Sequence, residues 1–495
     1  MMKKEVALTA VTTTAAAVVV VVAFARQYWR QRKDRQWKKT NRILRKFASE
    51  SATPVPKLWE VANAMVSDME ASVSSDHEQA KSSLNMLVSY ISPLPSGNEK
   101  GMYYGVNLRG TDFLMVCARL AGKYEPISDL FREEISIPSN VLTGTSQELF
   151  NFIAVEVARF ISAHPMDNDE SAANENKLGF TLSYAASQAT TAQSESAIKW
   201  NNFCSDDSWG KELVDQINQA LGQHGVDMRV SALVDDTVGD LAGGRYYNKD
   251  SVAAISLGMG TNAAYVDSAP SAPKWQDSLP KAGEIVINME WGNFDSSHLP
   301  ITQYDASLDS DSSNASSRKF EKLISGMYLG EIVRRVLVKM AQETALFGES
   351  VPSKLLIPYL LRSPDMAAMH QDTSEDREIV NEKLKEIFGI TNSTTMAREI
   401  VAEVCDIVTE RGARLAGAGI VAIIKKLGRI ANRKSVIIIE GGLYEHYRIF
   451  RNYLHSSVWE MLGNELSDNI IVEHSHGGSG AGALFLAASQ NPTVS

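Results

Sequence analysis

The chain has 495 residues, enough for two full domains, because one compact core rarely grows beyond roughly 250 to 300 residues. Hydrophobic residues make up 44% of it and charged residues 22%, which is typical of globular proteins and excludes a fibrous or largely disordered chain. The net charge of −10 argues against nucleic acid as the main partner, and the three widely spaced cysteines (Cys117, Cys204 and Cys405) provide neither a disulfide framework nor metal-ligand spacing.

An uncharged run, VALTAVTTTAAAVVVVVAFA, extends from Val6 to Ala25. As a helix it would measure about 30 Å, the thickness of the hydrocarbon core of a bilayer. Residues 1–25 are therefore predicted to form an N-terminal transmembrane anchor. The basic juxtamembrane segment 26–50 follows at once and predicts, by the positive-inside tendency, that the body of the protein lies in the cytosol.

A cleaved secretory signal is the main alternative to an anchor. Two lysines, Lys3 and Lys4, supply a charged start, and the sequence Ala23-Phe24-Ala25 fits the small-residue cleavage pattern. The dense basic charge after the run and the scarcity of cysteine favour the anchor. A transit peptide would require serines and spaced arginines in place of the consecutive valines from Val18 to Val22.

Beyond the anchor, the sequence alternates between helical and strand patterns. Apolar residues recur at helical spacing between Thr40 and Ser92, which predicts one or two helices leading to the body. Strands are then predicted at 103–106, 114–120, 178–184, 228–234, 253–257 and in the run SVIIIEGG, and helices at 148–164, 210–222, 320–344, 375–388 and 396–427. A strand, a glycine turn and a second strand occur near the start of each half, which indicates a duplicated α/β fold with a cleft between two lobes.

Several blocks of sequence together carry a specific resemblance to a known family. They are LGFTLSYAASQ, ALVDDTVGDLAGGRYYN, LGMGTNAAYV, INMEWGNF, FEKLISGMYLGEI, TERGARLAGAGI and GGLYEHY. From about Leu58 to Ser489 the chain resembles the eukaryotic hexokinases, in particular the membrane-anchored plant members and their hexokinase-like relatives. The resemblance implies an actin-like ATPase (ribonuclease H-like) fold whose two regions, 51–240 and 241–489, close on a hexose, with ATP and Mg²⁺ in the cleft.

The resemblance also implies the residues of the sugar site. Asp236 would be the base that takes the proton of the sugar hydroxyl, and a carboxylate at the end of a buried strand is chemically suited to this task. The positions that match sugar-contacting or sugar-loop residues are Ser183, Gln188, Asn201, Asn202, Asp235, Glu290 and Glu321.

Two of these positions depart from the family. Asn201-Asn202 stands where the family has Thr-Lys, so the cation expected at the hexose is absent. Asp235 replaces an asparagine, and a carboxylate only accepts hydrogen bonds, whereas an amide also donates. The second acid beside Asp236 tends to raise the pKa of one of the pair. Alternatively, Asp235 points to solvent or caps the next turn.

The nucleotide side departs further. The first phosphate loop contains NLRGTDFL, where the family has Asp-Leu-Gly-Gly-Thr-Asn-Phe-Arg. Arg109 replaces a glycine that would adopt positive φ freely, and Asn107 replaces an acid associated with the Mg²⁺ shell. Arg109 could alternatively supply a cation to the γ-phosphate. In the second loop, Met259 replaces a hydroxyl residue. The predicted cofactor-binding residues are Asn107, Arg109, Gly110, Thr111, Asp112, Gly258, Gly260, Thr261, Gly441 and Gly442, and no metal ligand is predicted.

The sequence therefore predicts a membrane-tethered, hexokinase-like protein that binds hexose, phosphorylates it feebly or not at all, and acts as a sugar-responsive regulator. A working ATP-dependent hexokinase that feeds glycolysis is the first alternative, supported by the retained carboxylates. A structural tether that binds neither ligand is the second. The resemblance points to the mitochondrial outer membrane, with another membrane or the plastid as alternatives, and it names no signalling partner.

Overall fold

The computed structural model describes residues 35–75, 81–89, 93–109, 111–165, 177–182, 208–277, 279, 281–431, 433–475 and 480–489. The predicted transmembrane anchor, residues 1–25, lies outside these ranges. Within them, no helix combines the length and the apolar character that crossing a bilayer requires.

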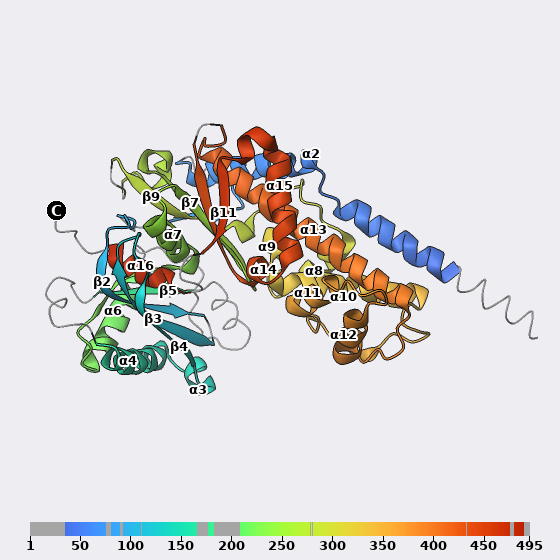
Figure 1. Cartoon of the computed structure of the whole chain (residues 1–495), viewed down its shortest axis with the longest axis horizontal. Coiled ribbons are helices and arrows are strands. Elements are labelled where there is room, and N and C mark those ends of the chain that lie inside the picture. The colour runs from blue at the N-terminus through green and yellow to red at the C-terminus, as the bar shows by residue number, and fades with distance from the viewer. Residues whose placement is uncertain are drawn as a thin grey trace, which may run out of the picture. The chain divides into compact units, whose positions relative to one another are not determined.

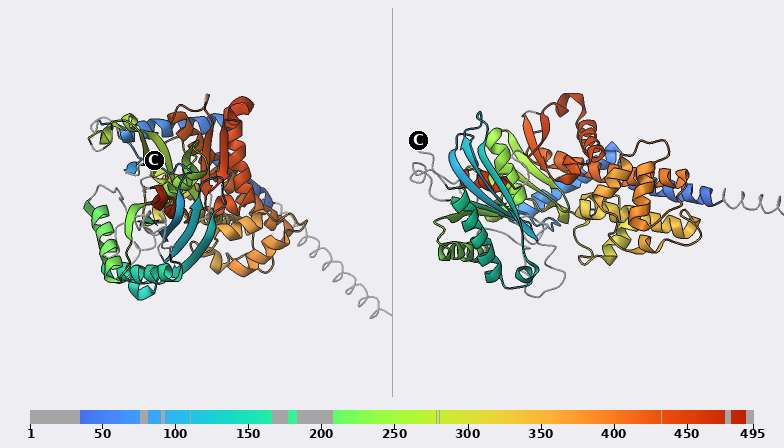
Figure 2. Two further views of the ribbon diagram at one scale, coloured as in Figure 1. Left: turned by 60° about the vertical axis from the view of Figure 1, so that its left-hand side comes forward. Right: turned by 60° about the horizontal axis from the view of Figure 1, so that its bottom comes forward.

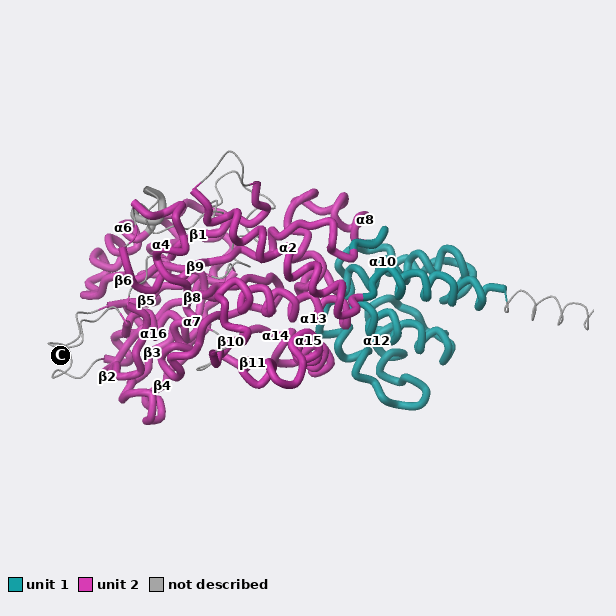
Figure 3. The backbone as a smooth tube through the Cα atoms, turned by 90° about the horizontal axis from the view of Figure 1, so that it is seen from above, with its two compact units in different colours: residues 1–52, 301–304, 330–408 teal, residues 53–300, 305–329, 409–495 magenta. Residues whose placement is uncertain are grey.

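The chain divides into two compact units (Figure 3). Unit 1 comprises residues 1–52, 301–304 and 330–408, and unit 2 comprises residues 53–300, 305–329 and 409–495. The candidate site residues belong to unit 2, so the geometry of the site can be described within one unit. The predicted boundary between residues 240 and 241 stays a prediction.

Unit 2 contains two β-sheets in the described part of the chain (Figure 1). The first has the strand order β4-β3-β2-β5-β6 and the second the order β1-β9-β8-β7-β10-β11. The strands are β1 (Leu87–Ser89), β2 (Lys100–Leu108), β3 (Asp112–Ala121), β4 (Ser128–Ser136), β5 (Lys177–Leu182), β6 (Arg229–Asp235), β7 (Ser251–Leu257), β8 (Thr261–Ser268), β9 (Glu284–Asn288), β10 (Ser435–Glu440) and β11 (Ile470–His474).

Parallel pairing brings the carboxyl ends of the strands to one edge of each sheet. β2, β5 and β6 run parallel, and so do β7, β10 and β11. Their near-continuous apolar runs, such as VIII in β10, are typical of strands that are covered on both faces. In open α/β sheets, ligands bind at the carboxyl ends of such strands. The motif residues at the ends of β2, β6, β7 and β10 therefore lie where this rule expects a site.

Two helices, α7 (Asp236–Tyr247) and α16 (Gly482–Ser489), lie between the sheets (Figure 2). They share one core cluster with both sheets, which includes Val116, Val234, Leu241, Ala254, Ile438 and Phe485. The two helices cross closely, because a Cβ atom at Gly482 would lie 2.3 Å from the backbone carbon of Gly239. This packing holds the start of α7, with its paired acids, in a constant position.

The remaining helices belong to both units. They are α2 (Val55–Val73), α3 (Ser139–Leu142), α4 (Ser146–Ala163), α6 (Ser208–Gln223), α8 (Gln303–Asp311), α9 (Lys319–Ile324), α10 (Gly326–Thr344), α11 (Ser363–His370), α12 (Glu378–Phe388), α13 (Thr395–Lys426), α14 (Gly442–Glu445) and α15 (Arg448–Ser467), and a further helix spans 35–51. Side chains of α4 and the C-terminal part of α6 pack on the first sheet in a second core cluster. A capping box of Thr145 and Glu148 begins α4.

Most of the predicted elements are confirmed where the structure describes them, including the strands β2, β3, β6, β7 and β10 and the helices α4, α12 and α13. The predicted helix 320–344 is wrong as one element, because Ser325 is extended (φ −92°, ψ 153°) and separates α9 from α10. The strands β4 and β9 and the helix α7 were not predicted, whereas β8 is the second strand of the strand, glycine turn and strand pattern predicted in the second half. Helix α7 is buried between two sheets and rich in glycine, so its sequence has no amphipathic pattern. Such a pattern is what predicts a helix from sequence.

Candidate active site

The paired acids stand at the junction of β6 and α7. Asp235 is the N-cap of α7, and its carboxylate accepts hydrogen bonds from the Thr237 backbone N–H at 2.9 Å and from Asn262 Nδ2 at 3.0 Å. The alternative that Asp235 caps the next turn is thus confirmed, but Asp235 also takes part in a side-chain network. Burial raises the pKa of Asp235, against the hydrogen bonds from Thr237 and Asn262, which lower it. Asp236, half-buried, is the first residue of α7.

Two asparagines extend this network to Glu290. Asn262 Nδ2 also donates to Asn288 Oδ1 at 2.7 Å, and Asn288 Nδ2 donates to Glu290 Oε1 at 3.2 Å. Glu290 itself has a left-handed backbone (φ 51°, ψ 40°), which is uncommon for a residue other than glycine and is often found at functional sites. The amide chain therefore fixes the relative positions of two of the predicted sugar carboxylates.

Arg318 joins the third predicted sugar carboxylate, Glu321, to the second. Its Nε lies 3.1 Å from Glu321 Oε2, and its Nη2 lies 3.6 Å from Glu290 Oε2. The Glu321 side chain is 0% exposed and that of Arg318 only 15%. A buried carboxylate requires such a partner, because an unpaired buried charge is costly. Arg318, Asn262 and Asn288 were not predicted as site residues, although Asn262 lies in the block LGMGTNAAYV and Asn288 in the block INMEWGNF.

The carboxylates influence one another's charge. Burial, together with the negative charges of Asp235 and Glu321, raises the pKa of Glu290 to about 8, against the hydrogen bond from Asn288. The raised pKa favours the protonated form of Glu290 at neutral pH, whereas the guanidinium of Arg318, 3.6 Å away, favours the charged form. A protonated carboxyl can donate as well as accept, and this suits a ligand rich in hydroxyl groups.

Replacing Glu290 with glutamine is expected to stabilise the fold most clearly at pH 8. The ordinary pKa is 4.5 and the folded value about 8, so between these values the folded state holds a proton that the unfolded state has lost, and stability falls as the pH rises. The slope from this group is at most about 1.4 kcal/mol per pH unit. Urea denaturation at pH 5 and pH 8 measures the difference, and glutamine should remove much of it.

The matched control for this variant is Glu382→Gln on α12, where the side chain is exposed. It should leave the pH dependence of unfolding unchanged. An equal slope in the Glu290→Gln variant and the unmodified protein would contradict the assignment of a proton to Glu290 at neutral pH.

The predicted second phosphate loop forms the turn between β7 and β8. The Gly258 N–H donates to the Gly260 carbonyl at 3.0 Å, and the Gly258 carbonyl accepts from the Gly326 N–H at 2.8 Å. A Cβ atom at Gly441 would lie 2.4 Å from the Leu257 carbonyl oxygen, and Gly441 has φ 114°, so only glycine fits there. The loops after β7 and β10 therefore meet, which brings Gly258, Gly260, Gly441 and Gly442 together.

Thr261 links this turn to the sugar side. Its hydroxyl donates to the Ser256 carbonyl at 2.8 Å and accepts from the Trp291 indole N–H at 2.9 Å. Thr261 is 2% exposed, so its hydroxyl has a structural role here. Its predicted contact with nucleotide stays a prediction. Trp291 directly follows Glu290, so its hydrogen bond to Thr261 connects the predicted sugar carboxylate Glu290 to the turn between β7 and β8.

The first loop connects β2 to β3. The Arg109 N–H donates to the Asp112 carbonyl at 2.9 Å, and Arg109 is not among the described residues with positive φ, so the steric cost expected from the lost glycine is not observed. Its Nη1 lies 3.8 Å from Asp112 Oδ1 and 3.4 Å from Glu134 Oε2. Two carboxylates of the same sheet thus attract the guanidinium. Thr111 lies beside Asp112, with its hydroxyl 3.4 Å from Asp112 Oδ2.

Asn107 and Asp240 are two further polar groups near the strand ends. Asn107, near the end of β2, is 2% exposed, and its Oδ1 atom has no hydrogen-bond partner among the described residues. Asp240 lies one turn after Asp236 on α7. Burial and the negative charges of Glu440, Asp236, Asp235 and Glu445 hold the pKa of Asp240 well above its usual range. Asp240 was not predicted as a site residue. Residues four apart are neighbours on a helix, so the spacing from Asp236 could have indicated that the two carboxylates lie close together.

The remaining predicted residues, Gly110, Ser183, Gln188, Asn201 and Asn202, lie outside the described residues, and their roles stay predictions. A phosphate group would fit the glycine turns, because backbone N–H groups are accessible where no side chain intervenes. In the described part of the chain, no three His, Cys, Asp or Glu residues are grouped as a metal site. Mg²⁺ commonly needs only one or two carboxylates when phosphate oxygens complete its shell, and Asp240 on α7 fits that requirement.

The chain is similar to known proteins over most of its length. Two family models, each described as hexokinase, match residues 43–246 and 252–489. A protein called Hexokinase-1 from Arabidopsis thaliana is 49% identical over 462 residues, covering 92% of each chain, and one from Spinacia oleracea is 46% identical over 501 residues, covering 99% of this chain and 98% of its own. The solved structure of a hexokinase from Schistosoma mansoni in complex with glucose has a TM-score of 0.76 at 26% identity, covering 92% of this chain and 99% of its own.

Proposed function

Because the chain belongs to the hexokinase family, we propose that it binds a hexose such as glucose at Asp235, Glu290 and Glu321 and phosphorylates it slowly or not at all. In this proposal the protein is a sugar-responsive regulator that contributes to glucose homeostasis. The observation that carries the proposal is the hydrogen-bonded cluster that runs from Asp235 through Asn262 and Asn288 to Glu290.

The chemistry of this cluster suits a hexose. Neighbouring sugar hydroxyls each donate one hydrogen bond and accept others, so they match a site that mixes carboxylates with amides. The pairing of Glu321 with Arg318 and of Glu290 with Asn288 holds the acceptors in place before the ligand arrives. A site organised in this way loses little entropy on binding.

Asp236 is the residue of this site that could accept a proton. It stands next to the sugar carboxylate Asp235 and begins a helix that is packed on both sides, so its position is rigid. It would take the proton of the attacking hydroxyl during transfer. ATP would supply the phosphoryl group, and Mg²⁺ would screen its charge. Residues that would hold them are Asp240 and the glycines Gly258, Gly260 and Gly441.

Slow transfer is proposed because of the composition of the nucleotide side. Asn107 is neutral where the family has an acid, and the guanidinium of Arg109 is engaged by Asp112 and Glu134 instead of being directed to a phosphate. Met259 is 57% exposed at the tip of the second loop, where it supplies no hydroxyl. A lost hydrogen bond to a charged group costs about 1.5 to 3 kcal/mol. Several such losses would slow transfer on the order of a thousandfold.

An active hexokinase that feeds glycolysis is the second candidate function. The specific observation in its favour is Asp240, a buried carboxylate one turn after Asp236 that could replace the acid lost at Asn107. A coupled assay of hexose 6-phosphate formation separates the two candidates. Turnover at the rates typical of enzymes, about 1 to 1,000 per second, would end the proposal of a feeble enzyme. Background turnover together with thermal stabilisation by glucose would support it.

The double variant Asn107→Asp with Arg109→Gly is expected to raise the rate of hexose phosphorylation roughly tenfold or more, because it restores an acid for the Mg²⁺ shell and removes from the loop a side chain that Asp112 and Glu134 hold. The rate at saturating glucose measures the gain. Asp236→Ala added to the double variant serves as the control and should abolish the gain. An unchanged rate in the double variant would show that the first loop does not limit catalysis.

Attachment to a membrane through residues 1–25 completes the proposal. The length of the uncharged run Val6–Ala25 and the basic residues after it support a single-pass anchor with a cytosolic body. The mitochondrial outer membrane is the proposed location, and another membrane or the plastid is the alternative. Fractionation tests the location. Alkaline carbonate extraction tests the anchor, because an anchored protein stays in the pellet, and recovery in the supernatant would refute the anchor.

A further inference from the structure

The helix over residues 35–51 in unit 1 has two distinct faces. Thr40, Leu44, Phe47 and Ser51 are buried, at spacings of three and four residues. Phe47 meets Tyr304 edge to face, with ring centroids 5.3 Å apart. This stripe attaches the helix to unit 1. The helix therefore does not need its other face for its own packing.

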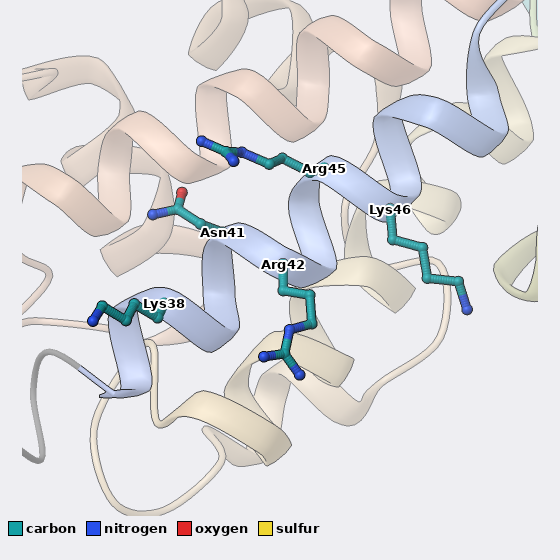
Figure 4. A pocket seen from close by; sticks show the side chains of 5 residues that line it. All are labelled: Lys38, Asn41, Arg42, Arg45 and Lys46. Atoms are coloured by element: carbon teal, nitrogen blue, oxygen red, sulfur yellow. The ribbon is translucent and has the colours of Figure 1, made fainter.

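The other face is basic along its length. It carries Arg35, Lys38, Lys39, Arg42, Arg45 and Lys46, and each of these residues is exposed. They follow one another at helical spacing, so they form a continuous strip, which we call the basic face. An open pocket on this helix is lined by Lys38, Asn41, Arg42, Arg45 and Lys46, whose side chains extend from consecutive turns (Figure 4).

Carboxylates neutralise little of the basic face. Lys39 pairs with Glu343 at 3.1 Å and Lys46 with Glu50 at 3.6 Å, and both pairs are solvent-exposed, so they are of small energetic value. Within the described residues, no ion pair involves Arg35, Lys38, Arg42 or Arg45. This concentration of positive charge occurs in a chain whose net charge is −10. Repulsion between these cations lowers the stability of the fold, so their retention favours a function that uses the positive charge.

We propose that the basic face binds the head groups of anionic phospholipids at the surface of a membrane. The uncharged run ends at Ala25, and the extended chain from there to Arg35 reaches at most about 35 Å. Basic clusters immediately beside a membrane segment are the sequence pattern that binds anionic lipids, with about 1 kcal/mol for each Lys or Arg near the surface. Nucleic acid fits less well, because the rest of the chain is acidic and would repel it.

Head-group binding would add a second, independent attachment to the membrane. The anchor would respond to the hydrophobic core of any bilayer, whereas the basic face would respond to surface charge and to salt. Since the buried stripe keeps the helix on unit 1, lipid would be bound by the folded protein without release of the helix. The inference does not depend on the hexose site.

The test uses the full chain with Val19→Asp and Val21→Asp, so that the uncharged run does not insert into a bilayer. Sedimentation is measured with vesicles of phosphatidylcholine alone and with vesicles that contain about 30% phosphatidylserine. We expect binding to the anionic vesicles only, and its loss at high salt. Adding Arg42→Gln and Arg45→Gln should lower partitioning roughly 30-fold. The matched control, Lys354→Gln with Lys385→Gln, removes two exposed cations elsewhere in unit 1 and should change it less than about twofold.

The outcomes that would overturn the proposal are specific. Equal binding to neutral and anionic vesicles, or an unchanged partition coefficient in the Arg42→Gln, Arg45→Gln variant, would do so. Salt-sensitive binding to a short RNA with no vesicle binding would assign the basic face to nucleic acid instead. The chain with an unaltered apolar run, measured on neutral vesicles, reports the anchor separately, so that failure of the anchor and failure of the basic face are distinguishable.

Discussion

Replacing Asp236 with alanine is expected to lower hexose phosphorylation by about a hundred- to ten-thousandfold, because it removes the group that accepts the proton of the attacking hydroxyl. Asp236 follows β6 and begins α7, and the close crossing of α7 with α16 at Gly239 and Gly482 holds it in place. No neighbouring side chain can take over this role easily, because Asp235 is engaged as the cap of α7. The coupled assay at saturating glucose and ATP measures the loss.

The same variant should retain hexose binding. Alanine leaves the network of Asp235, Asn262, Asn288 and Glu290 intact, so glucose should still raise the thermal unfolding temperature. Asp277→Ala, which removes an exposed carboxylate, is the control and should keep the activity of the unmodified protein. If the Asp236→Ala protein phosphorylates glucose at the unmodified rate, the catalytic role of Asp236 is wrong. If it loses glucose stabilisation as well, Asp236 contributes to binding and is not only a base.

Replacing Arg318 with methionine is expected to destabilise the fold by about 3 to 5 kcal/mol at neutral pH, the usual effect of removing one partner of a buried ion pair. Methionine keeps much of the side-chain volume but leaves Glu321, which is 0% exposed, without its guanidinium. It also removes the cation next to Glu290. Urea denaturation measures the loss, and glucose affinity should fall with it because the two acceptors are no longer held in place.

Two further variants separate charge from packing in this prediction. Arg318→Lys keeps the charge without the planar fork, so it should recover part of the stability. Lys281→Met removes an exposed cation elsewhere in unit 2 and should have little effect. An Arg318→Lys variant as unstable as Arg318→Met would indicate that lost packing and geometry, and not the missing charge, cause the deficit.

These two predictions address the two requirements of the proposed site. Asp236 tests whether the chain retains the chemical group for transfer, and Arg318 tests how the sugar carboxylates are kept together. A protein in which Arg318 matters strongly and Asp236 hardly at all would be a hexose-binding regulator. Strong effects of both residues are expected, and the absolute turnover of the unmodified protein then separates a feeble enzyme from an active hexokinase.

The sequence alone predicted the family, the strands β2, β3, β6, β7 and β10, and the candidate carboxylates, because these depend on local patterns. A buried parallel strand is a run of apolar residues. Asp236, Glu290 and Glu321 could be named without any coordinates because the sequence blocks around them resemble those of the hexokinases. The charge of the basic face could likewise be read from residues 26–50, although not its arrangement on one side of a helix.

Only the tertiary structure decided how these residues act on one another. The asparagine bridge from Asp235 to Glu290 joins β6, β8 and β9, and Arg318 reaches Glu290 and Glu321 from a left-handed turn before α9. Such contacts depend on which strands are neighbours and not on distance along the chain. The same reason explains the pKa of about 8 at Glu290 and the attraction of Arg109 to Glu134. Electrostatic energies depend on separation and burial in space, and a linear sequence contains neither quantity.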